Sequence, residues 1–331
     1  MKKSQMIDNE KQIFKDDPWQ GIERGTYPSG RRLYLKDERY WISRDSLNQL
    51  VFYIQDVCTT TIPIVEAISS VNINVEQYKK NEQRLVCTFT ESSEKSIEKF
   101  GLAIKSIAVK TDRLRGIALF TEIKKELKEW SDFLKENNKP LSQSELIGFW
   151  GELYVISHYI MEEHDDLDTI RYWAGPSGGK KDIVLNSLAI EVKTTTSSSS
   201  KEIKISSLDQ LDKTTEKLYL MHLFINYADK ENGLTLSYLY EFVKCKIQHD
   251  FETLSLYTRR AGNIFERASS KQKNEHFLCS DINMYDVLDD FPKLLRSDVP
   301  AGVPEAKYSI SISSIQPFNV TESLAEIIRY G

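Results

Sequence analysis

Residues 181–193 read KDIVLNSLAIEVK, and this stretch decides the fold that we expect of the chain. Two short apolar runs flank an Asn-Ser pair at 186–187, which is typical of a turn, so the stretch predicts a hairpin of two strands. Asp182, Glu191 and Lys193 bring charge into these otherwise apolar strands. Because a buried charge is costly unless it is paired or bound to a metal ion, the three side chains indicate a functional site.

The register of the hairpin sets the relative positions of its two carboxylates. Closing the hairpin symmetrically at the Asn-Ser turn pairs Ile183 with Ile190, and the next pair outward is Asp182 with Glu191. Lys193 follows on the same face as Glu191. Like charges that oppose each other are destabilising, whereas a hard cation between them, Mg²⁺ or Mn²⁺, makes the pair favourable. Lys193 would then reach a metal-bound water or a phosphate oxygen, although a bulge would shift this register.

Composition restricts the class of protein. The 331 residues suggest about two domains, and 40% apolar with 28% charged residues is typical of a folded soluble chain. A formal net charge of −5 gives no overall attraction to nucleic acid, so such binding would rest on local patches. Four scattered cysteines without a CxxC pair favour reduced thiols over a disulfide or zinc framework. Since we find neither an apolar leader nor an 18-residue apolar run, we expect a cytoplasmic protein with no membrane association.

Periodicity and turn residues predict two domains, 1–138 and 139–331, separated near the Asn-Asn-Lys-Pro sequence at 137–140. After an irregular polar lead-in, the first domain is expected to combine strands with long helices, namely a hairpin at 31–43, strands at 50–57 and 84–90, and one or two helices over 93–136. We expect this domain to contact partner proteins or DNA.

The second domain is expected to begin with a helix that is capped by Ser142 or Ser144 and runs to about Ile160. Later elements are expected in this order: the hairpin at 182–195, a Ser/Thr-rich loop, a strand at 203–205, a turn at 208–211, a strand at 218–227, a helix at 236–243, a strand at 308–315 and a helix at 322–329. Glu152 lies among apolar helix neighbours, which favours a partly buried carboxylate. The alternative is a surface glutamate paired with a lysine.

Other patterns are weaker. The glycine-rich stretch at 175–181 lacks the spacing of a phosphate-binding loop. The five histidines show no zinc spacing, and His222 in an apolar strand is expected in the core. Basic residues between 259 and 273 could contact phosphates, but a solvated helix face is the stronger expectation. Aromatic residues of the first hairpin are expected in the core: Tyr34, Tyr40 and Trp41.

Taken together, the residues resemble a known family. The resemblance is carried by a succession of short motifs: Gly151-Glu152-Leu153, Trp173, Lys181-Asp182, Glu191-Val192-Lys193-Thr194-Thr195 and Gln210-Leu211. This succession resembles the PD-(D/E)XK nuclease superfamily, above all its bacterial branch of unknown function, and is clear over about residues 140–230. Lys181 stands where the family often has the proline that precedes the aspartate.

The resemblance implies a restriction-endonuclease-like core. This is an α/β (α+β) fold in which helices flank a mixed central sheet, here preceded by a smaller N-terminal α+β domain. It also implies that Asp182, Glu191 and the carbonyl of Val192 hold Mg²⁺, with Mn²⁺ as a substitute. Glu152 would bind or orient a metal-bound water from its helix.

The two remaining site residues would act on the substrate. Lys193 would orient or help to deprotonate the attacking water and would stabilise charge on the phosphate, and Gln210 would support the substrate or the metal shell. The implied activity is Mg²⁺-dependent endonucleolytic hydrolysis of DNA in a bacterial restriction or phage-defence system. One alternative is a catalytically silent nuclease-fold subunit that binds DNA or a protein partner in a defence complex. Another is an enzyme that acts on RNA or branched DNA. Double-strand cleavage would favour a homodimer.

Overall fold

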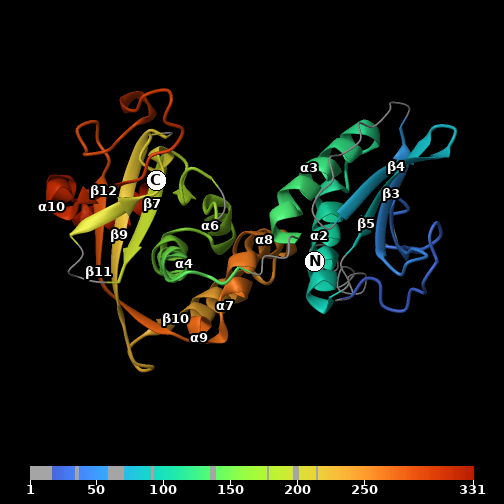
Figure 1. Cartoon of the computed structure of the whole chain (residues 1–331), viewed down its shortest axis with the longest axis horizontal. Coiled ribbons are helices and arrows are strands. Elements are labelled where there is room, and N and C mark those ends of the chain that lie inside the picture. The colour runs from blue at the N-terminus through green and yellow to red at the C-terminus, as the bar shows by residue number, and fades with distance from the viewer. Residues whose placement is uncertain are drawn as a thin grey trace. The chain divides into compact units, whose positions relative to one another are not determined.

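The computed structural model describes residues 17–33, 37–58, 71–90, 93–134, 139–176, 179–196, 201–213 and 215–331. The chain forms two compact units, Met1–Glu136 and Asn137–Gly331, each with a sheet and a hydrophobic core of its own (Figure 1). Residues 1–16 of the predicted lead-in at 1–30, Tyr34 and the serine run at 197–200 lie outside the described residues. In the ranges that the structure describes, no helix is both long enough and apolar enough to span a bilayer.

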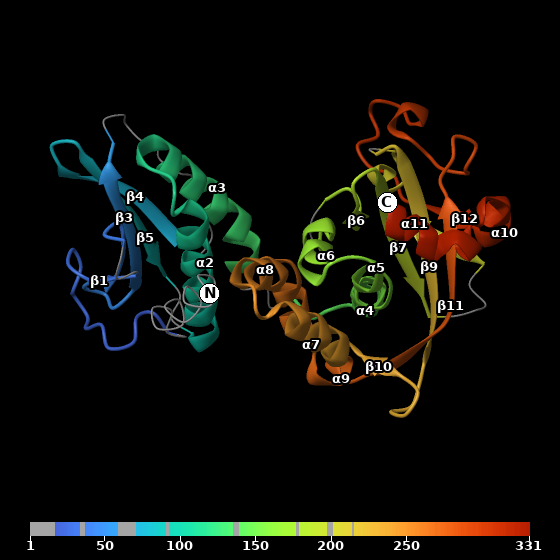
Figure 2. The same cartoon turned by 180° about the vertical axis from the view of Figure 1, so that it is seen from behind.

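The first unit packs two helices against one face of a five-stranded antiparallel sheet (Figure 2). The strand order is β1-β2-β3-β5-β4. Its elements are β1 (Arg31–Arg32), β2 (Tyr40–Arg44), β3 (Leu50–Val57), β4 (Val71–Lys79), β5 (Glu82–Phe89), α2 (Glu94–Thr111) and α3 (Gly116–Leu134).

Most of the predicted elements of this unit are confirmed. The first hairpin forms, the strand at 50–57 is β3, and the long helical pattern divides into α2 and α3, with Ser93 as the N-cap of α2. Tyr40 is buried as expected, whereas Trp41 is only partly so. Sequence analysis missed β4, because every second residue of VNINVEQYK near its start is an exposed asparagine, a poor strand former.

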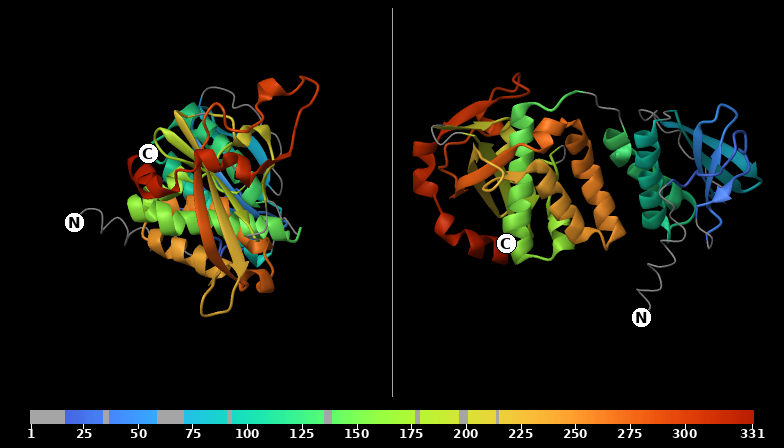
Figure 3. Two further views of the ribbon diagram at one scale, coloured as in Figure 1. Left: turned by 90° about the vertical axis from the view of Figure 1, so that its left-hand side faces the viewer. Right: turned by 90° about the horizontal axis from the view of Figure 1, so that it is seen from below.

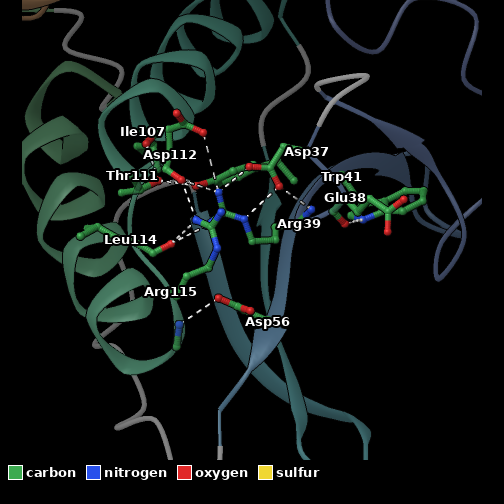
Figure 4. Close-up of polar contacts among 12 residues, drawn as sticks. Asp37, Glu38, Arg39, Trp41, Asp56, Ile107, Thr111, Asp112, Leu114 and Arg115 are labelled. Carbon is green, nitrogen blue, oxygen red and sulfur yellow. Dashed lines mark hydrogen bonds and ion pairs between the residues drawn. The ribbon is translucent and has the colours of Figure 1, made fainter.

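A buried arginine ties the α2–α3 connection to this sheet (Figure 4). Arg39 donates hydrogen bonds to the carbonyl oxygens of Asp112 and Leu114, at 2.7 and 2.6 Å, and pairs with a neighbouring aspartate. From β3, Asp56 accepts the N–H of Gly116, the first residue of α3, at 2.8 Å. Since these contacts occupy the guanidinium with partners from its own chain, the cluster stabilises the fold of the first unit.

The second unit is built on a mixed five-stranded sheet of order β10-β11-β9-β7-β6, in which β7 and β9 are parallel. The predicted α+β class is therefore confirmed. The strands of the second unit are β6 (Ile183–Val184), β7 (Leu188–Thr195), β8 (Glu202–Ile205), β9 (Lys217–Tyr227), β10 (Leu234–Thr235), β11 (His276–Asp286) and β12 (Tyr308–Ser311). Of these, β8 and β12 form a separate two-stranded sheet. The longer helices of this unit are α4 (Gln143–Val155), α6 (Asp166–Tyr172), α7 (Leu236–Ile247), α8 (Phe251–Arg267) and α11 (Leu324–Tyr330). Short helical segments complete the second unit: η1 (Ile156–Ile160), α5 (Met161–Glu163), η2 (Leu208–Gln210), α9 (Ser270–Lys273), η3 (Arg296–Asp298), α10 (Ile312–Ile315), η4 (Gln316–Phe318) and η5 (Thr321–Ser323).

Helices and a small two-stranded sheet cover opposite faces of this mixed sheet. Helices α4, α7 and α8 lie on one side, and β8, β12 and α10 lie on the other (Figure 3). Ile190 and Val192 of β7 point into the helical core, while Ala189 belongs to the core on the other side. Strand β7 is thus buried on both faces, which explains its apolar sequence.

Several predicted elements of the second unit are also confirmed. Ser142 caps α4 in a capping box with Glu145, the strand at 218–227 is β9, and His222 is fully buried. The predicted strand at 308–315 is partly wrong, because it ends at Ser311 and continues as α10. Neither the full extent of α8 nor β11 was predicted, although a helix face was expected over 259–273. The second of these is hard to recognise because it carries many polar residues and a bulge between Cys279 and Asp281.

A glycine allows α4 to approach β7 closely. A Cβ atom at Gly151 would overlap the Oγ1 of Thr194 on β7, whereas a Cβ atom at Gly148, almost one turn earlier, would have no neighbour within 4 Å. This contact fixes the distance between the helix that carries Glu152 and the strand that carries Glu191.

We predict that Gly151→Ala lowers the free energy of unfolding by about 1–3 kcal/mol, because a methyl group would be forced into a packed interface. Gly148→Ala is the matched control and should be neutral or stabilising by up to about 1 kcal/mol, since alanine is the better helix former. Urea denaturation of both variants measures the difference. Equal stability of the two variants would contradict the close approach at Gly151.

Candidate active site

The predicted hairpin forms, and it places Asp182 at the start of β6. The expected register is confirmed where the strands pair, since Ile183 lies opposite Ile190. At the residue that precedes Ile183, the Oδ2 atom of Asp182 accepts a hydrogen bond from the N–H of Val192 at 2.7 Å. The carbonyl of Asp182 accepts the N–H of Ala174 at 2.8 Å. Main-chain contacts on two sides therefore fix Asp182 beside β7.

Glu191 and Lys193 form an ion pair along β7. The Oε1 atom of Glu191 accepts a hydrogen bond from Nζ of Lys193 at 2.6 Å. The Glu191 side chain is 1% exposed, whereas the Lys193 side chain keeps 16% of its surface in contact with solvent. Burying the Glu191 carboxylate is costly, and the ammonium group of Lys193 offsets part of that cost while it keeps contact with solvent.

Glu152 on α4 is the third carboxylate, and it is partly buried as predicted. It is 9% exposed, and its Oε2 atom accepts a hydrogen bond from Nε1 of Trp173 at 2.8 Å. Trp173 is fully buried and forms an isolated bridge with Ile183 of β6. The alternative of a surface glutamate paired with a lysine is wrong. Sequence analysis named Trp173 within the motif but gave it no role, because this contact spans 21 residues.

Burial shifts the pKa values of all three carboxyls in the same direction. Desolvation and the nearby charge of Asp182 raise the pKa of Glu152 well above its usual range. Desolvation also raises the pKa of Asp182, although Lys193 opposes that shift. For Glu191, burial and the charge of Asp182 raise the pKa to about 7. The carboxyls thus influence one another electrostatically. A bound cation would lower the energy of their charged forms.

The donor atoms fit a magnesium ion held by few protein ligands. Among the residues that the structure describes, no group of three or more His, Cys, Asp or Glu side chains is arranged to hold a metal ion. Mg²⁺ keeps several waters and is often bound through only one or two carboxylates. Asp182 and Glu191 supply two carboxylates, the first partly and the second fully buried, that repel each other, and the carbonyl of Val192 directly follows Glu191 in the chain. These oxygens match what Mg²⁺ requires.

Gln210 is linked to the hairpin through a lysine. Its Oε1 atom accepts the N–H of Ser206 at 2.8 Å, and its carbonyl oxygen accepts a hydrogen bond from Nζ of Lys181 at 2.8 Å. Lys181 is only 3% exposed and also donates to the carbonyl oxygen of Asp209. Burial lowers the pKa of Lys181, and Glu191 is the foremost charge that opposes this shift. Sequence analysis assigned no contact to Lys181.

The basic stretch at 259–273 has a structural role at two positions. Arg260 donates hydrogen bonds to the carbonyl oxygens of Ile170, at 2.6 Å, and Trp173. Arg267 pairs with Glu145 at 2.8 Å. The expectation of a solvated helix face is therefore wrong for these two arginines, which hold α8 against α6 and the start of α4.

Comparison with known families gives one match. The family is described as "Putative PD-(D/E)XK family member, (DUF4420)", and it matches residues 16–313. No match was found among curated proteins or among solved structures.

We predict that Glu191→Gln stabilises the metal-free protein relative to wild type as the pH rises. The folded-state pKa of Glu191 is raised from 4.5 to about 7, so the stability that this carboxyl contributes is complete below pH 4.5 and is lost as the pH rises through 7. Between pH 5 and pH 8 the variant should gain about 3 kcal/mol on wild type. Urea unfolding in the presence of a chelator measures this gain, and a pH-independent difference would mean that Glu191 has an ordinary pKa.

Proposed function

This chain belongs to the family described as "Putative PD-(D/E)XK family member, (DUF4420)", and from that premise we propose that it is a Mg²⁺-dependent endonuclease that hydrolyses DNA phosphodiester bonds. The observation that carries the proposal is the β6–β7 hairpin. It brings a partly buried aspartate, a buried glutamate and a partly exposed lysine together at Asp182, Glu191 and Lys193. A structural role alone does not account for two carboxylates that raise the energy of each other's charged form, whereas metal-dependent phosphodiester hydrolysis uses such a pair to bind a cation.

Asp182, Glu191 and the carbonyl of Val192 would hold the ion. When bound, a divalent ion supplies positive charge for the phosphate oxygens and acidifies a water molecule. Glu152 would accept a hydrogen bond from such a water, because the indole of Trp173 holds only its Oε2 atom. The other carboxylate oxygen of Glu152 would be the one that accepts from the water.

Lys193 would act on the substrate. Its ammonium group is bonded to Glu191 but remains partly exposed, so a small rotation could bring it to a non-bridging phosphate oxygen. A fixed positive charge at that oxygen stabilises the transition state of phosphoryl transfer.

The biological setting is part of the same proposal. By analogy with the family, we propose a role in a bacterial restriction or phage-defence system. DNA would be the substrate, and other proteins of that system would be binding partners. The first unit would contact DNA or such a partner. Double-strand cleavage with one site in each chain would require a homodimer or paired binding events.

One observation favours a second candidate, a catalytically silent subunit that binds DNA or a partner. Each of the three carboxylates already has a hydrogen-bond partner within the chain: Val192 N–H, Lys193 and the Trp173 indole. A nuclease fold that has lost catalysis could keep these contacts because they stabilise the fold.

We predict that the purified chain cleaves DNA in Mg²⁺ or Mn²⁺ and that Lys193→Ala lowers the rate by about 100-fold or more, since one fixed charge at the transition state contributes that much. Lys244→Ala removes an exposed lysine of α7 and serves as the matched control. Supercoiled plasmid, linear duplex, single-stranded DNA and RNA should be assayed in parallel.

The outcomes separate the candidates. Cleavage that is lost in a folded Lys193→Ala variant and kept in Lys244→Ala supports the nuclease. Binding of DNA without cleavage, together with no metal affinity that depends on Asp182 in a comparison with Asp182→Asn, supports the silent subunit. Equal cleavage by wild type and Lys193→Ala would refute the assigned site.

A further inference from the structure

His222 is a fully enclosed histidine in the strand next to the candidate active site. Strand β9 lies beside β7 (Figure 1), and the parallel register of the two strands places His222 directly opposite Lys193. Because side chains alternate along both strands, His222 shares the face of the sheet that carries Lys193 and Glu191. A histidine in such an apolar strand is costly, since burial removes water from both ring nitrogens.

One of the two ring nitrogens of His222 has a partner among the described residues, and the other has none there. Nε2 lies 3.2 Å from Oγ1 of Thr195, the last residue of β7, whereas Nδ1 is buried without a hydrogen-bond partner. The ring packs against Phe224, with 4.2 Å between the ring centroids. An apolar side chain would fill this place without leaving a polar atom unsatisfied. Packing alone therefore does not account for a histidine at this position, and its polar contact is with Thr195.

The side chain of Thr195 is accessible, whereas that of His222 is not. Thr195 is partly exposed and lies two residues beyond Lys193 on the same face of β7. Two residues of an extended strand span about 6.6 Å, so the two side chains leave the strand at that separation. Thr194 points to the opposite face, where its Oγ1 atom is buried next to Gly151 of α4.

The tautomer of His222 decides the direction of its hydrogen bond with Thr195. Burial lowers the pKa of His222 to about 4, so the imidazole is neutral at neutral pH and carries one N–H. A proton on Nδ1 would be a buried donor without an acceptor in the described part of the chain, whereas a proton on Nε2 is donated to Oγ1 of Thr195. Since buried N–H groups without an acceptor are rare in folded proteins, the second tautomer is favoured. The hydroxyl proton of Thr195 then remains for a donor contact outside the protein.

We propose that the Thr195 hydroxyl donates a hydrogen bond to a phosphate oxygen of bound DNA, beside the phosphate that Lys193 contacts, and that His222 is the positioning residue that orients this hydroxyl. Threonine hydroxyls commonly contact phosphates and so fix the register of a protein on nucleic acid. A contact that is equally strong in the bound substrate and in the transition state lowers KM and leaves kcat unchanged. The inference rests on the proposed function, because it requires DNA at the β6–β7 hairpin.

The test is the concentration dependence of DNA cleavage by the full chain in Mg²⁺, with a linear duplex as substrate. Thr195→Val replaces the hydroxyl by a methyl group of similar size, so it should raise KM about tenfold and leave kcat within about twofold of wild type. Thr195→Ser keeps the hydroxyl and should restore most of the wild-type KM. Thr194→Val is the matched control, since that hydroxyl oxygen is buried on the opposite face, and its KM should equal that of wild type.

A double-mutant cycle tests the positioning role of His222. His222→Phe removes both ring nitrogens and should raise KM at least about twofold. Combined with Thr195→Val it should raise KM no further, because His222 acts through that hydroxyl. His222→Gln, whose amide can donate from a similar position, should keep KM close to wild type. His222→Leu replaces His222→Phe if that variant does not fold.

The outcomes separate this inference from the proposed function. Cleavage by wild type with an unchanged KM in Thr195→Val would overturn the phosphate contact and leave the nuclease intact. Additive effects of Thr195→Val and His222→Phe would overturn the positioning role of His222. A wild type that neither binds nor cleaves DNA would overturn the proposed function and this inference together.

Discussion

The structure of the second unit depends on one constraint. Three largely enclosed carboxylates, those of Glu152, Asp182 and Glu191, lie close enough to influence one another's pKa values. An apolar strand that is covered on both faces is a costly place for negative charge. Each carboxylate accepts a hydrogen bond that reduces this cost. Asp182 accepts from the N–H of Val192, Glu191 from Lys193, and Glu152 from the indole of Trp173. The pKa values of the three carboxyls are raised, chiefly by burial, so these partners offset the cost of burying the charges only in part. A divalent cation would offset much of the rest.

The surrounding fold positions the partners more rigidly than the hairpin could alone. Gly151 brings α4 close to β7, so Glu152 is set at a fixed distance from the strand. Trp173 is held at its carbonyl by Arg260 of α8 and at its indole by Glu152. A rigid chain of contacts therefore runs from α8 to the site, and it explains why arginines that resemble a phosphate-binding patch in the sequence serve packing instead.

The parts of the site that depend on local sequence patterns could be predicted. The contacts between residues far apart in the sequence could not. The turn at 186–187, the alternation of the strands and the capping box at Ser142 depend on neighbours in sequence, so the hairpin, its register and α4 could be predicted. The Trp173–Glu152 and Lys181–Gln210 contacts join residues 21 and 29 positions apart, and no periodicity encodes them. The strands β4 and β11 were missed because their polar residues face solvent, which removes the apolar signal on which strand prediction relies.

The two lysines of the site differ in a way that fits a division of roles. Lys193 donates to a carboxylate and keeps contact with solvent, so it can exchange its partner for a phosphate oxygen at little cost. Lys181 donates to two main-chain carbonyls and is enclosed, so moving it would leave those carbonyls without a partner. A lysine at the position where the wider superfamily often has proline thus keeps the strand entry fixed, as a proline would, and adds a charge that a proline cannot.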